Sequence, residues 1–428
     1  MPRCLKELLL VPLSVRMPTL WANRDFLRLW LGQSASQLGS FAGQVTLPLV
    51  AVTALGAGAT QLGVLRAVQQ VPILLCSLFV GVLVDRWQAR ATMMYADLGR
   101  ALVLGIVPLG LGVVPLGWML GMPFLYVVAF TVGVFTVCFD VAYMASLPRL
   151  VNHHELAQGN SMLETTRSAA QICGPALGGA LVSLLTAPFA VVASALLFAF
   201  SSVSIGRIRG LRSSAEGSSS GLVRQIRAGL RVVVRDGSLR AIAIATCAYQ
   251  FSFTALTTVY LLFLTRALEL PGAIVGLVLA AFGPGVLIGS LLSAWLPRRL
   301  GYGRVVVYAA LTSDLVMLCT SGLHSPGPIT IAALITINVL YGVLSQSVDV
   351  AVTAIRQAVT PLPVQGRVVA TINFLGMGLT PVGALLGGVT AAALGTRTAL
   401  LLATLGLFLS PLCLSLSPLA RLGRTLTR

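Results

Sequence analysis

The sequence has few charged residues, and one basic residue type is almost absent. Only 10% of the 428 residues are charged, and Lys6 is the single lysine. A Walker A loop requires a lysine after its glycines, and none can be written around Lys6, so nucleotide hydrolysis through that motif is excluded. The three histidines form no metal-binding pattern, and no G-x-S-x-G elbow occurs. The sequence therefore predicts neither an enzyme nor a bound metal or cofactor.

Paired cysteines are also missing. Seven cysteines are dispersed along the chain without any Cys-x-x-Cys spacing, and all but Cys4 fall inside apolar segments. This distribution predicts neither disulfides nor a thiolate metal site.

Apolar residues, by contrast, dominate the chain. They make up 57% of it, and the mean hydropathy of +0.92 exceeds what one soluble core of this length could bury. A spanning helix needs roughly 20 mainly apolar residues, so we predict an all-α, polytopic membrane protein of about twelve spans. The predicted spans are 27–54, 61–84, 92–114, 122–146, 157–185, 187–206, 239–264, 273–296, 305–323, 328–352, 367–393 and 398–417.

Arginine is distributed unequally between the two sides of these spans. The net charge of +17 is scattered between apolar segments, which is unlike the compact basic surface of a nucleic-acid-binding domain. One side has only Arg66, Arg266 and Arg397. The other side has Arg24, Arg28, Arg86, Arg90, Arg149, Arg207, Arg209, Arg212, Arg298, Arg299, Arg304, Arg367, Arg421 and Arg424. Because positive loops stay in the cytoplasm, both termini and the central loop are predicted to be cytoplasmic.

The two halves of the chain repeat each other. Arg24-Asp25 recurs as Arg235-Asp236, the motif FDVA recurs as VDVA, and GPALGG recurs as TPVGALLGG, at offsets of 211, 209 and 209 residues. Equivalent spans keep their orientation at these offsets, so the repeat is parallel. A parallel repeat of six spans is typical of a two-lobed transporter.

These features divide the chain into five predicted segments. They are a cytoplasmic leader at 1–20, a six-helix bundle at 21–206, a cytoplasmic linker at 207–238, a second six-helix bundle at 239–418 and a cytoplasmic tail at 419–428. The linker places an arginine series beside an apolar stripe: Arg224, Arg227, Arg231 and Arg235 with Leu222, Ile226 and Leu230. This pattern predicts an amphipathic helix on an anionic inner leaflet, or one that only ties the bundles together.

The loop after the second predicted span contains a known motif. It reads GVLVDRWQAR, with Gly81, Asp85, Arg86 and Arg90, and it resembles the loop pattern G-x-x-x-D-R-x-x-R-R of the major facilitator superfamily. The resemblance implies a conformational latch between neighbouring spans. A loop that only sets the topology is the plainer interpretation.

A glycine-proline motif lies in the fifth predicted span. The segment QICGPALGG is similar to a motif of proton-coupled drug antiporters in the same superfamily, although the longer glycine pattern upstream is absent. Small residues let helices approach closely, and proline bends a helix, so we predict helix packing at both copies of the motif. The residues concerned are Gly174, Pro175, Gly178, Gly179, Pro381, Gly387 and Gly388.

A wider resemblance covers most of the chain. NRDFLRLWLGQSASQLGS and GRVVATINFLGMGLTPVGALLGG look like the bacterial branch that contains macrolide-efflux and enterobactin-exporter proteins. This resemblance implies the major facilitator fold of two pseudo-symmetric six-helix bundles, a monomer in the bacterial inner membrane, and efflux. Ser40 stands where an acid often follows Gly39 in that branch, so a coupling role at this position is not expected.

Ionisable residues inside spans are candidates for function because they are costly in lipid. Asp97 with Arg100, and Glu164 with Arg167, are spaced so that each pair can neutralise itself on one helix face. We predict that the first pair is structural. We predict that Glu164, on a span expected to line the cavity, is the leading proton carrier, with Arg167 beside it.

Four further ionisable residues have open interpretations. Asp140 and Asp349 hold equivalent positions near the ends of two spans, where they either serve transport or pair with a nearby arginine. Asp314 and Arg66 have no local partner, so each either pairs with another span or faces the translocation path.

Two polar and aromatic sets are candidates for the substrate cavity. Gln33, Gln37 and Gln44 repeat on one face of the first span. Tyr249, Gln250 and Phe253 provide an aromatic wall from the seventh span, although aromatic clusters also face lipid.

The sequence thus predicts a secondary-active exporter of amphipathic small molecules, such as drugs, antibiotics or siderophores. Proton antiport and alternating access between the two bundles are the predicted mechanism. Two alternatives remain open at this point: a nutrient importer on the same fold, and a membrane scaffold or sensor without transport activity.

Overall fold

The computed structural model describes residues 20, 23–86, 88–112, 121–151, 155–185, 187–209, 230–293, 295–361, 364–421 and 423. Within these ranges, side chains are not described at 76–86, 109–112, 145, 148, 149, 157 and 421. The described residues contain helices and turns but no strand, so the all-α prediction is confirmed.

The first half of the chain forms a bundle of six long helices, here called the N-lobe. They are α3 (Arg24–Thr53), α4 (Ala59–Arg86), α5 (Ala89–Gly112), α6 (Met122–Leu150), α7 (Leu156–Leu185) and α8 (Ala187–Gly206). Asn23 starts α3 by accepting hydrogen bonds from the backbone N–H groups of Asp25 and Phe26. Gly56, with a φ of 60°, makes the tight turn that leads from α3 into α4.

The second half forms the C-lobe, in which several spans are divided into consecutive helices. They are α10 (Gly237–Leu262) with η1 (Phe263–Ala267), α11 (Gly272–Ala280) with α12 (Phe282–Leu292), and α13 (Leu296–Leu300). There follow α14 (Tyr302–Arg304), η2 (Val305–Ala309), α15 (Ala310–Leu318), η3 (Cys319–Gly322) and α16 (Pro328–Val359). The last are α17 (Gln365–Gly378), α18 (Thr380–Leu394), α19 (Thr396–Leu407), α20 (Leu409–Ser415) and η5 (Pro418–Arg421). Asp236 starts α10 as Asn23 starts α3, by capping two backbone N–H groups.

Proline explains three of the divided spans. α11 ends at Ala280 before Pro284, α17 ends at Gly378 before Pro381, and α19 ends at Leu407 before Pro411. Proline lacks a backbone N–H and its ring clashes with the carbonyl four residues earlier, so each helix is interrupted about one turn before it.

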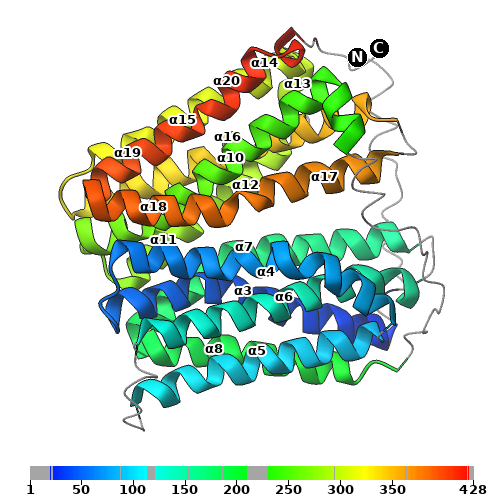
Figure 1. Cartoon of the computed structure of the whole chain (residues 1–428), viewed down its shortest axis with the longest axis vertical. Helices are drawn as coiled ribbons and strands as arrows, with labels where there is room; N and C mark the ends of the chain where they lie inside the picture. Colours follow the sequence, from blue (N-terminus) through cyan, green and yellow to red (C-terminus); the bar gives the residue numbers. More distant parts are fainter. Residues whose placement is uncertain are drawn as a thin grey trace, which may run out of the picture.

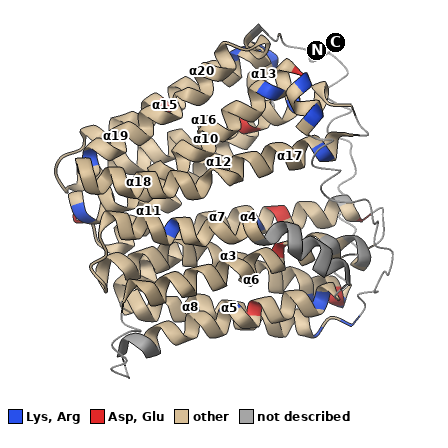
Figure 2. Ribbon diagram, in the orientation of Figure 1, with Lys and Arg blue, Asp and Glu red and all other residues tan. Residues whose placement is uncertain are grey.

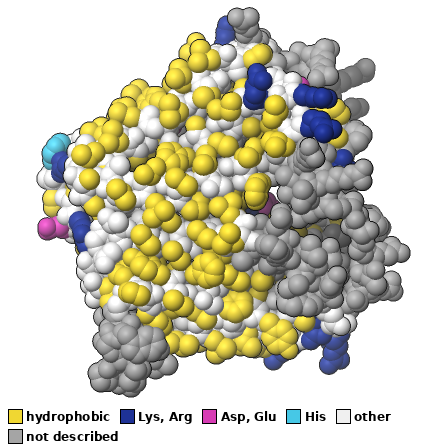
Figure 3. Space-filling view, viewed as in Figure 1, with side chains coloured by type: hydrophobic (Ala, Val, Ile, Leu, Met, Phe, Trp, Pro, Cys, Tyr) yellow, Lys and Arg dark blue, Asp and Glu magenta, His cyan; other side chains and the backbone are white. Residues whose placement is uncertain are grey.

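The number of spans agrees with the sequence prediction. Within the described residues, nine helical segments are long and apolar enough to cross a membrane. The other three long helices, α3, α4 and α5, complete a set of twelve. Hydrophobic side chains cover much of the face seen in Figure 3 between its two ends, and within the spans Leu102 and Leu196 are 61% and 65% exposed. Such an exposed apolar surface is stable in lipid and not in water.

The two lobes are packed alike. In the N-lobe, α3 lies against α7 and α8, and in the C-lobe α10 lies against α18 and α19. Likewise α4 packs on α6, and α12 packs on α16. Figure 1 shows the lobes as two layers of helices, with both chain termini at one end of the molecule.

The lobes touch at the end away from the termini and diverge toward the end that has them (Figure 1). Two helix pairs make most of the contact, α4 with α18 and α7 with α11. A Cβ atom on Gly388 would lie 2.7 Å from the Cα of Gly63, and one on Gly276 would lie 2.7 Å from the Cα of Gly179. The helices therefore meet backbone to backbone at both crossings, and we call this region the sealed end.

Both copies of the glycine-proline motif follow one packing rule. Gly178 packs on the carbonyl of Ala42 in α3, and Gly387 packs on the carbonyl of Ala255 in α10. A Cβ atom added to these two glycines would lie 2.9 and 2.8 Å from the respective carbonyl oxygens, so each glycine holds its lobe together. The glycines that follow them, Gly179 and Gly388, face the opposite lobe. In each copy of the motif, one glycine therefore packs within its own lobe and the next packs against the other lobe.

The sealed end is predicted to open when Gly388 is enlarged. We expect Gly388→Leu to weaken the α4–α18 crossing by about 1–3 kcal/mol, because overpacked contacts force the backbones apart. The reporter is disulfide crosslinking of Ser183→Cys with Ala273→Cys, where the Ser183 Oγ lies 2.6 Å from the Ala273 backbone N, in a background without the native cysteines.

The crosslink yield should fall by about fivefold or more in Gly388→Leu. Gly105→Leu is the matched control, because apart from its own helix backbone no described atom lies within 4 Å of a Cβ at that position. Equal crosslinking in both variants would show that the glycine crossing does not hold the end closed.

Candidate functional site

A cavity of about 400 Å³ lies between the lobes, next to the sealed end. We call it the central cavity. Its N-lobe wall includes Gln44 from α3 and Arg66 and Gln70 from α4, while Gln171 comes from α7. α10 contributes Gln250, Phe253 and Tyr260 to the opposite wall, together with residues of α12, α16 and α18.

Aromatic rings form much of the C-lobe wall. Phe253 stacks on Tyr249 at 5.4 Å and on Tyr341 at 6.3 Å between ring centroids, and Phe282 lies 6.0 Å from Tyr341. The Tyr249 and Tyr341 hydroxyls are 3.3 Å apart. Such a wall offers stacking surface to a planar or apolar molecule.

A second cavity of about 400 Å³ enters the C-lobe, and it shares Gln171, Gln250 and Phe282 with the central cavity. Asp314 of α15 and Asp349 of α16 line it. The residue Asp314 is only 4% exposed, and no described side chain forms a hydrogen bond or ion pair with it. Asp349 also has no ion pair with Arg356 or any other described residue, so the helix-end pair, one of the two interpretations that the sequence left open, is absent there.

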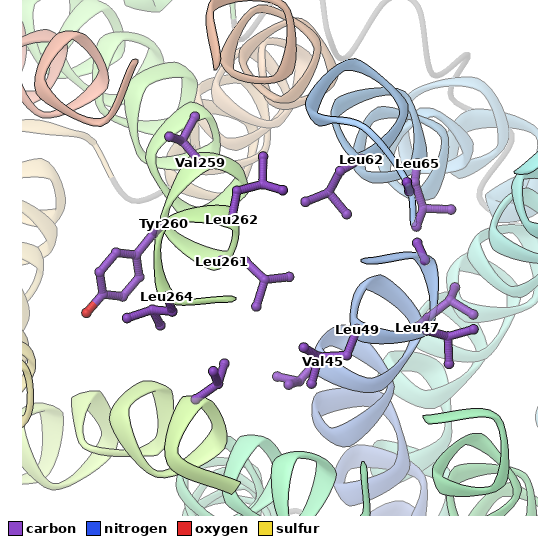
Figure 4. Packing of buried hydrophobic residues seen from close by; sticks show 14 of the residues in the cluster. Val45, Leu47, Leu49, Leu62, Leu65, Val259, Tyr260, Leu261, Leu262 and Leu264 are labelled. Atoms are coloured by element: carbon purple, nitrogen blue, oxygen red, sulfur yellow. The ribbon is translucent and has the colours of Figure 1, made fainter. Parts of the chain in front are cut away.

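Apolar side chains and one arginine close the central cavity at the sealed end. Figure 4 shows Leu261 and Leu262 pointing from α10 toward the helices that carry Leu49 and Leu62. Beyond them, the guanidinium of Arg266 donates hydrogen bonds to the backbone carbonyls of Gly56 and Ala57 in the other lobe. Arg266 therefore links the π-helical end of α10 to the turn between α3 and α4.

Glu164 and Arg167 do not lie together in the central cavity. They form an ion pair of 2.6 Å on α7, with side chains that are 61% and 48% exposed. Glu164 lies in an open groove between α7 and α12 that includes Ile172 and Leu287, whereas Arg167 reaches the C-lobe cavity. The role predicted for Glu164 as leading proton carrier stays a prediction.

The Asp97–Arg100 pair is buried within the N-lobe. The side chains are 0% and 1% exposed, and the Arg100 guanidinium donates to Asp97 and to the Ser36 hydroxyl at 3.1 Å. The same guanidinium lies over the rings of Phe139 and Phe198 at 4.7 and 4.3 Å. Ionic, hydroxyl and aromatic groups therefore join α5 to α3, α6 and α8.

The structure places Gln33 away from the cavity, contrary to the sequence prediction. Gln33 is 2% exposed and lines neither cavity, and Gln37 lines neither as well, whereas Gln44 lines the central cavity. Gln33 and Gln44 lie at different depths along α3, and only the part of the helix near Gln44 reaches the cavity. One turn before Gln33, Trp30 donates a 2.9 Å hydrogen bond to Thr166, so α7 covers this part of α3. The other predicted cavity residues, Tyr249, Gln250 and Phe253, all line one cavity or both.

Several predicted residues lie where the structure gives partial information. Gly81, Asp85 and Arg86 belong to α4, but their side chains lie outside the described set, so the latch stays a prediction. Arg90 donates to the backbone carbonyl of Gly206 within its own lobe. Asp140 of α6 is exposed and has no ion pair among the described residues.

Most of the predicted amphipathic helix in the linker also lies outside the described residues. Residues 230–235 are helical, with Arg231 and Arg235 exposed. Val233 is 2% exposed and packs into the apolar cluster at the C-lobe's terminus end.

Comparison with known families accounts for the architecture. A family model described as "Transmembrane secretion effector" matches residues 19–425, which is nearly the whole chain. The chain belongs to this family of major facilitator transporters. It is a transporter by family, and not an enzyme.

Two curated bacterial proteins are similar in sequence. The MFS-type transporter y4rN of Sinorhizobium fredii is 31% identical over 247 residues, which are 57% of this chain and 59% of that protein. The multidrug efflux pump Tap of Mycolicibacterium fortuitum is 27% identical over 348 residues, or 77% of this chain and 80% of that pump. The match to y4rN thus spans about three fifths of each protein.

Solved transporter structures share the fold. The nucleoside transporter NupG superposes with a TM-score of 0.73 at 11% identity, covering 91% of this chain and 98% of that one. A bacterial homologue of ferroportin in the inward-facing state gives 0.69 at 16% identity, with 91% and 98% coverage. At these identities the likeness shows the fold alone, and it confirms the two six-helix bundles.

The buried pair in the N-lobe is predicted to be structural. We expect Asp97→Ala to destabilise the protein by about 3–5 kcal/mol, because it leaves the Arg100 guanidinium buried without its counter-charge. Glu164→Ala, which breaks an exposed pair of the same spacing, should change stability by about 1 kcal/mol at most. Thermal unfolding of the purified protein in detergent compares the two.

Removing both charges provides the control. In Asp97→Ala/Arg100→Ala the uncompensated charge is gone, so part of the lost stability should return. Equal destabilisation by Asp97→Ala and Glu164→Ala would contradict the structural role of the buried pair.

Proposed function

We propose that this transporter is a secondary-active exporter of amphipathic small molecules that works by proton antiport and alternating access. The observation that carries the proposal is the central cavity, which lies between the lobes and is closed at the sealed end by apolar side chains, Arg266 and the glycine crossings. A substrate held there contacts both lobes, so their rocking motion would expose it to one side of the membrane and then to the other.

The distribution of arginine supports the orientation. In Figure 2 the basic residues lie mainly on the ribbon at the end that carries the chain termini, with fewer at the sealed end. Under the positive-inside rule the terminus end is cytoplasmic, and the cavity then faces the cytoplasm. A cytoplasm-facing cavity is the loading state of an exporter.

The lining supports an amphipathic substrate. Stacked aromatic rings cover the C-lobe wall, while glutamine amides and one guanidinium lie on the N-lobe side. The similarity to the pump Tap, whose name describes multidrug efflux, favours export over uptake.

Asp314 is the proton carrier that we propose, in preference to Glu164. A carboxylate that takes up and releases protons during transport must be reachable from water in one state and must lack a permanent counter-charge. Asp314 lines a cavity and has no described partner, whereas Glu164 is already neutralised by Arg167. Asp349, in the same cavity, is the second candidate.

Proteoliposomes containing the purified transporter test the function. We expect lipophilic fluorescent drugs to be driven across the membrane by an imposed proton gradient, and Asp314→Asn to abolish the gradient-driven component because the asparagine side chain carries no proton. Glu269→Gln is the control, since it removes a carboxylate from an exposed loop outside both cavities. Glu164→Gln should retain at least about half of the activity.

Two results would contradict the proposal. Gradient-driven flux that persists in Asp314→Asn but is lost in Glu164→Gln would return the coupling role to Glu164. Transport of drugs or nutrients only toward the terminus side would identify an importer.

A further inference from the structure

The central cavity has an unbalanced charge. Among the described residues that line it, Arg66 is the one charged side chain, and neither Asp nor Glu is present. Arg66 also lines a smaller pocket that extends into the N-lobe, between α3, α4 and α6, and the described lining of that pocket again contains no carboxylate. Asp314 and Asp349 line the adjoining C-lobe cavity instead.

Arg66 has no partner among the described residues that would neutralise it. Its Nε atom is buried and makes no hydrogen bond, and no described carboxylate lies within ion-pairing distance of its guanidinium. Arginines in membrane spans are usually paired, as Arg100 is with Asp97 in the same lobe. An arginine kept unpaired beside a cavity is suited to bind an anion that arrives from outside the protein.

Two amides accompany the guanidinium. Gln70 follows Arg66 by one helical turn on the same face of α4. Gln44, from α3, lines the same two cavities as Arg66 and Gln70, namely the central cavity and the smaller N-lobe pocket. Guanidinium and amide N–H groups can together donate to both oxygens of a carboxylate, which is the geometry that arginine recognises best. The N-lobe wall therefore offers donors, while Asp314 and Asp349 offer acceptors only in the neighbouring cavity.

The C-lobe wall of the central cavity favours a substrate that contains a ring system. Phe253, Tyr341 and Phe282 form a continuous aromatic surface on the C-lobe side of the same cavity. A molecule that contacts both walls thus needs an aromatic or apolar body and an acidic group at its edge.

We infer that Arg66, with Gln44 and Gln70, forms an anion subsite and that the preferred substrates are aromatic molecules with one acidic group, a carboxylate or a phenolate. This inference rests on the proposed function, which it narrows to a substrate class. Binding of the acid in the N-lobe and of the ring in the C-lobe joins the two lobes through the substrate, so the acidic group would also help to drive the lobes together.

Equilibrium binding tests the inference without any gradient, so its result does not depend on the direction or coupling of transport. The probes are two forms of one xanthene dye, the free carboxylic acid and its methyl ester, measured by fluorescence polarisation with the full-length transporter in nanodiscs. We expect the wild type to bind the acid more tightly than the ester by about tenfold or more, because charge-assisted hydrogen bonds are lost in the ester.

Substitution at Arg66 should remove this preference. Arg66→Gln is expected to weaken binding of the acid by about tenfold or more and to leave the ester within about twofold, which also shows that the variant is folded. Arg66→Lys, which keeps the charge but not the planar fork, should give an intermediate value. The matched control is Arg397→Gln, because this guanidinium lies outside both cavities and donates to the carbonyl of His324.

Three results would overturn the inference. The first is equal binding of acid and ester by the wild type, and the second is failure of the wild type to bind the acid. The third is an equal loss of both ligands in Arg66→Gln with the fold intact, which would show that Arg66 serves the conformational cycle, for example by pairing with Asp314 in another state. Failure of gradient-driven transport with selective binding of the acid retained would instead refute the proposed function.

Discussion

The structure depends on two places where helices of opposite lobes meet backbone to backbone. Gly63 faces Gly388, and Gly179 faces Gly276, at equivalent positions of the internal repeat. Lipid gives helices no hydrophobic reason to associate, so close approach of small residues supplies the packing that joins the lobes. Because these contacts lie at one end, the lobes are free to diverge at the other, and the cavity between them opens there.

The distribution of charge follows from the same arrangement. Ionic groups that only hold a lobe together are paired and buried, as Asp97 and Arg100 are behind α3. Arg66 and Asp314 line the cavities and have no described partner. They belong to different lobes, because Arg66 is on the N-lobe side and Asp314 is in the C-lobe. A change in the distance between lobes therefore changes the electrostatic environment of both groups, which is what coupling of an ion to a substrate requires.

Much of the fold could be predicted from the sequence, because a bilayer restricts spanning segments to helices of a known length. The repeat of Gly179 at Gly388 was also visible as a sequence pattern, and in the structure both glycines pack against a helix of the opposite lobe. Sequence could not assign the partner of each glycine, since closure also involves Gly63 of α4 and Gly272 and Gly276 of α11, which lie outside the repeated glycine-proline motif.

The candidate site was less predictable, because a helical face extends over the whole depth of a span. Gln33 and Gln44 share a face of α3, yet only Gln44 reaches the depth of the cavity. Spacing likewise made Asp97–Arg100 and Glu164–Arg167 look equivalent, whereas one pair is buried and the other is exposed. Asp314 has no local sequence signal, and only the assembly of α15 with α10 and α16 places it beside the C-lobe cavity.

We propose that the sealed end and the terminus end open in turn. Spin labels on α7 and α11 at the sealed end, and on α7 and α17 at the terminus end, can report both distances by double electron–electron resonance while pH and substrate are varied. Alternating access predicts that the sealed-end distance lengthens as the terminus-end distance shortens, in the same population of molecules. Independent changes at the two ends, or a terminus end that stays open under all conditions, would contradict alternating access in this protein.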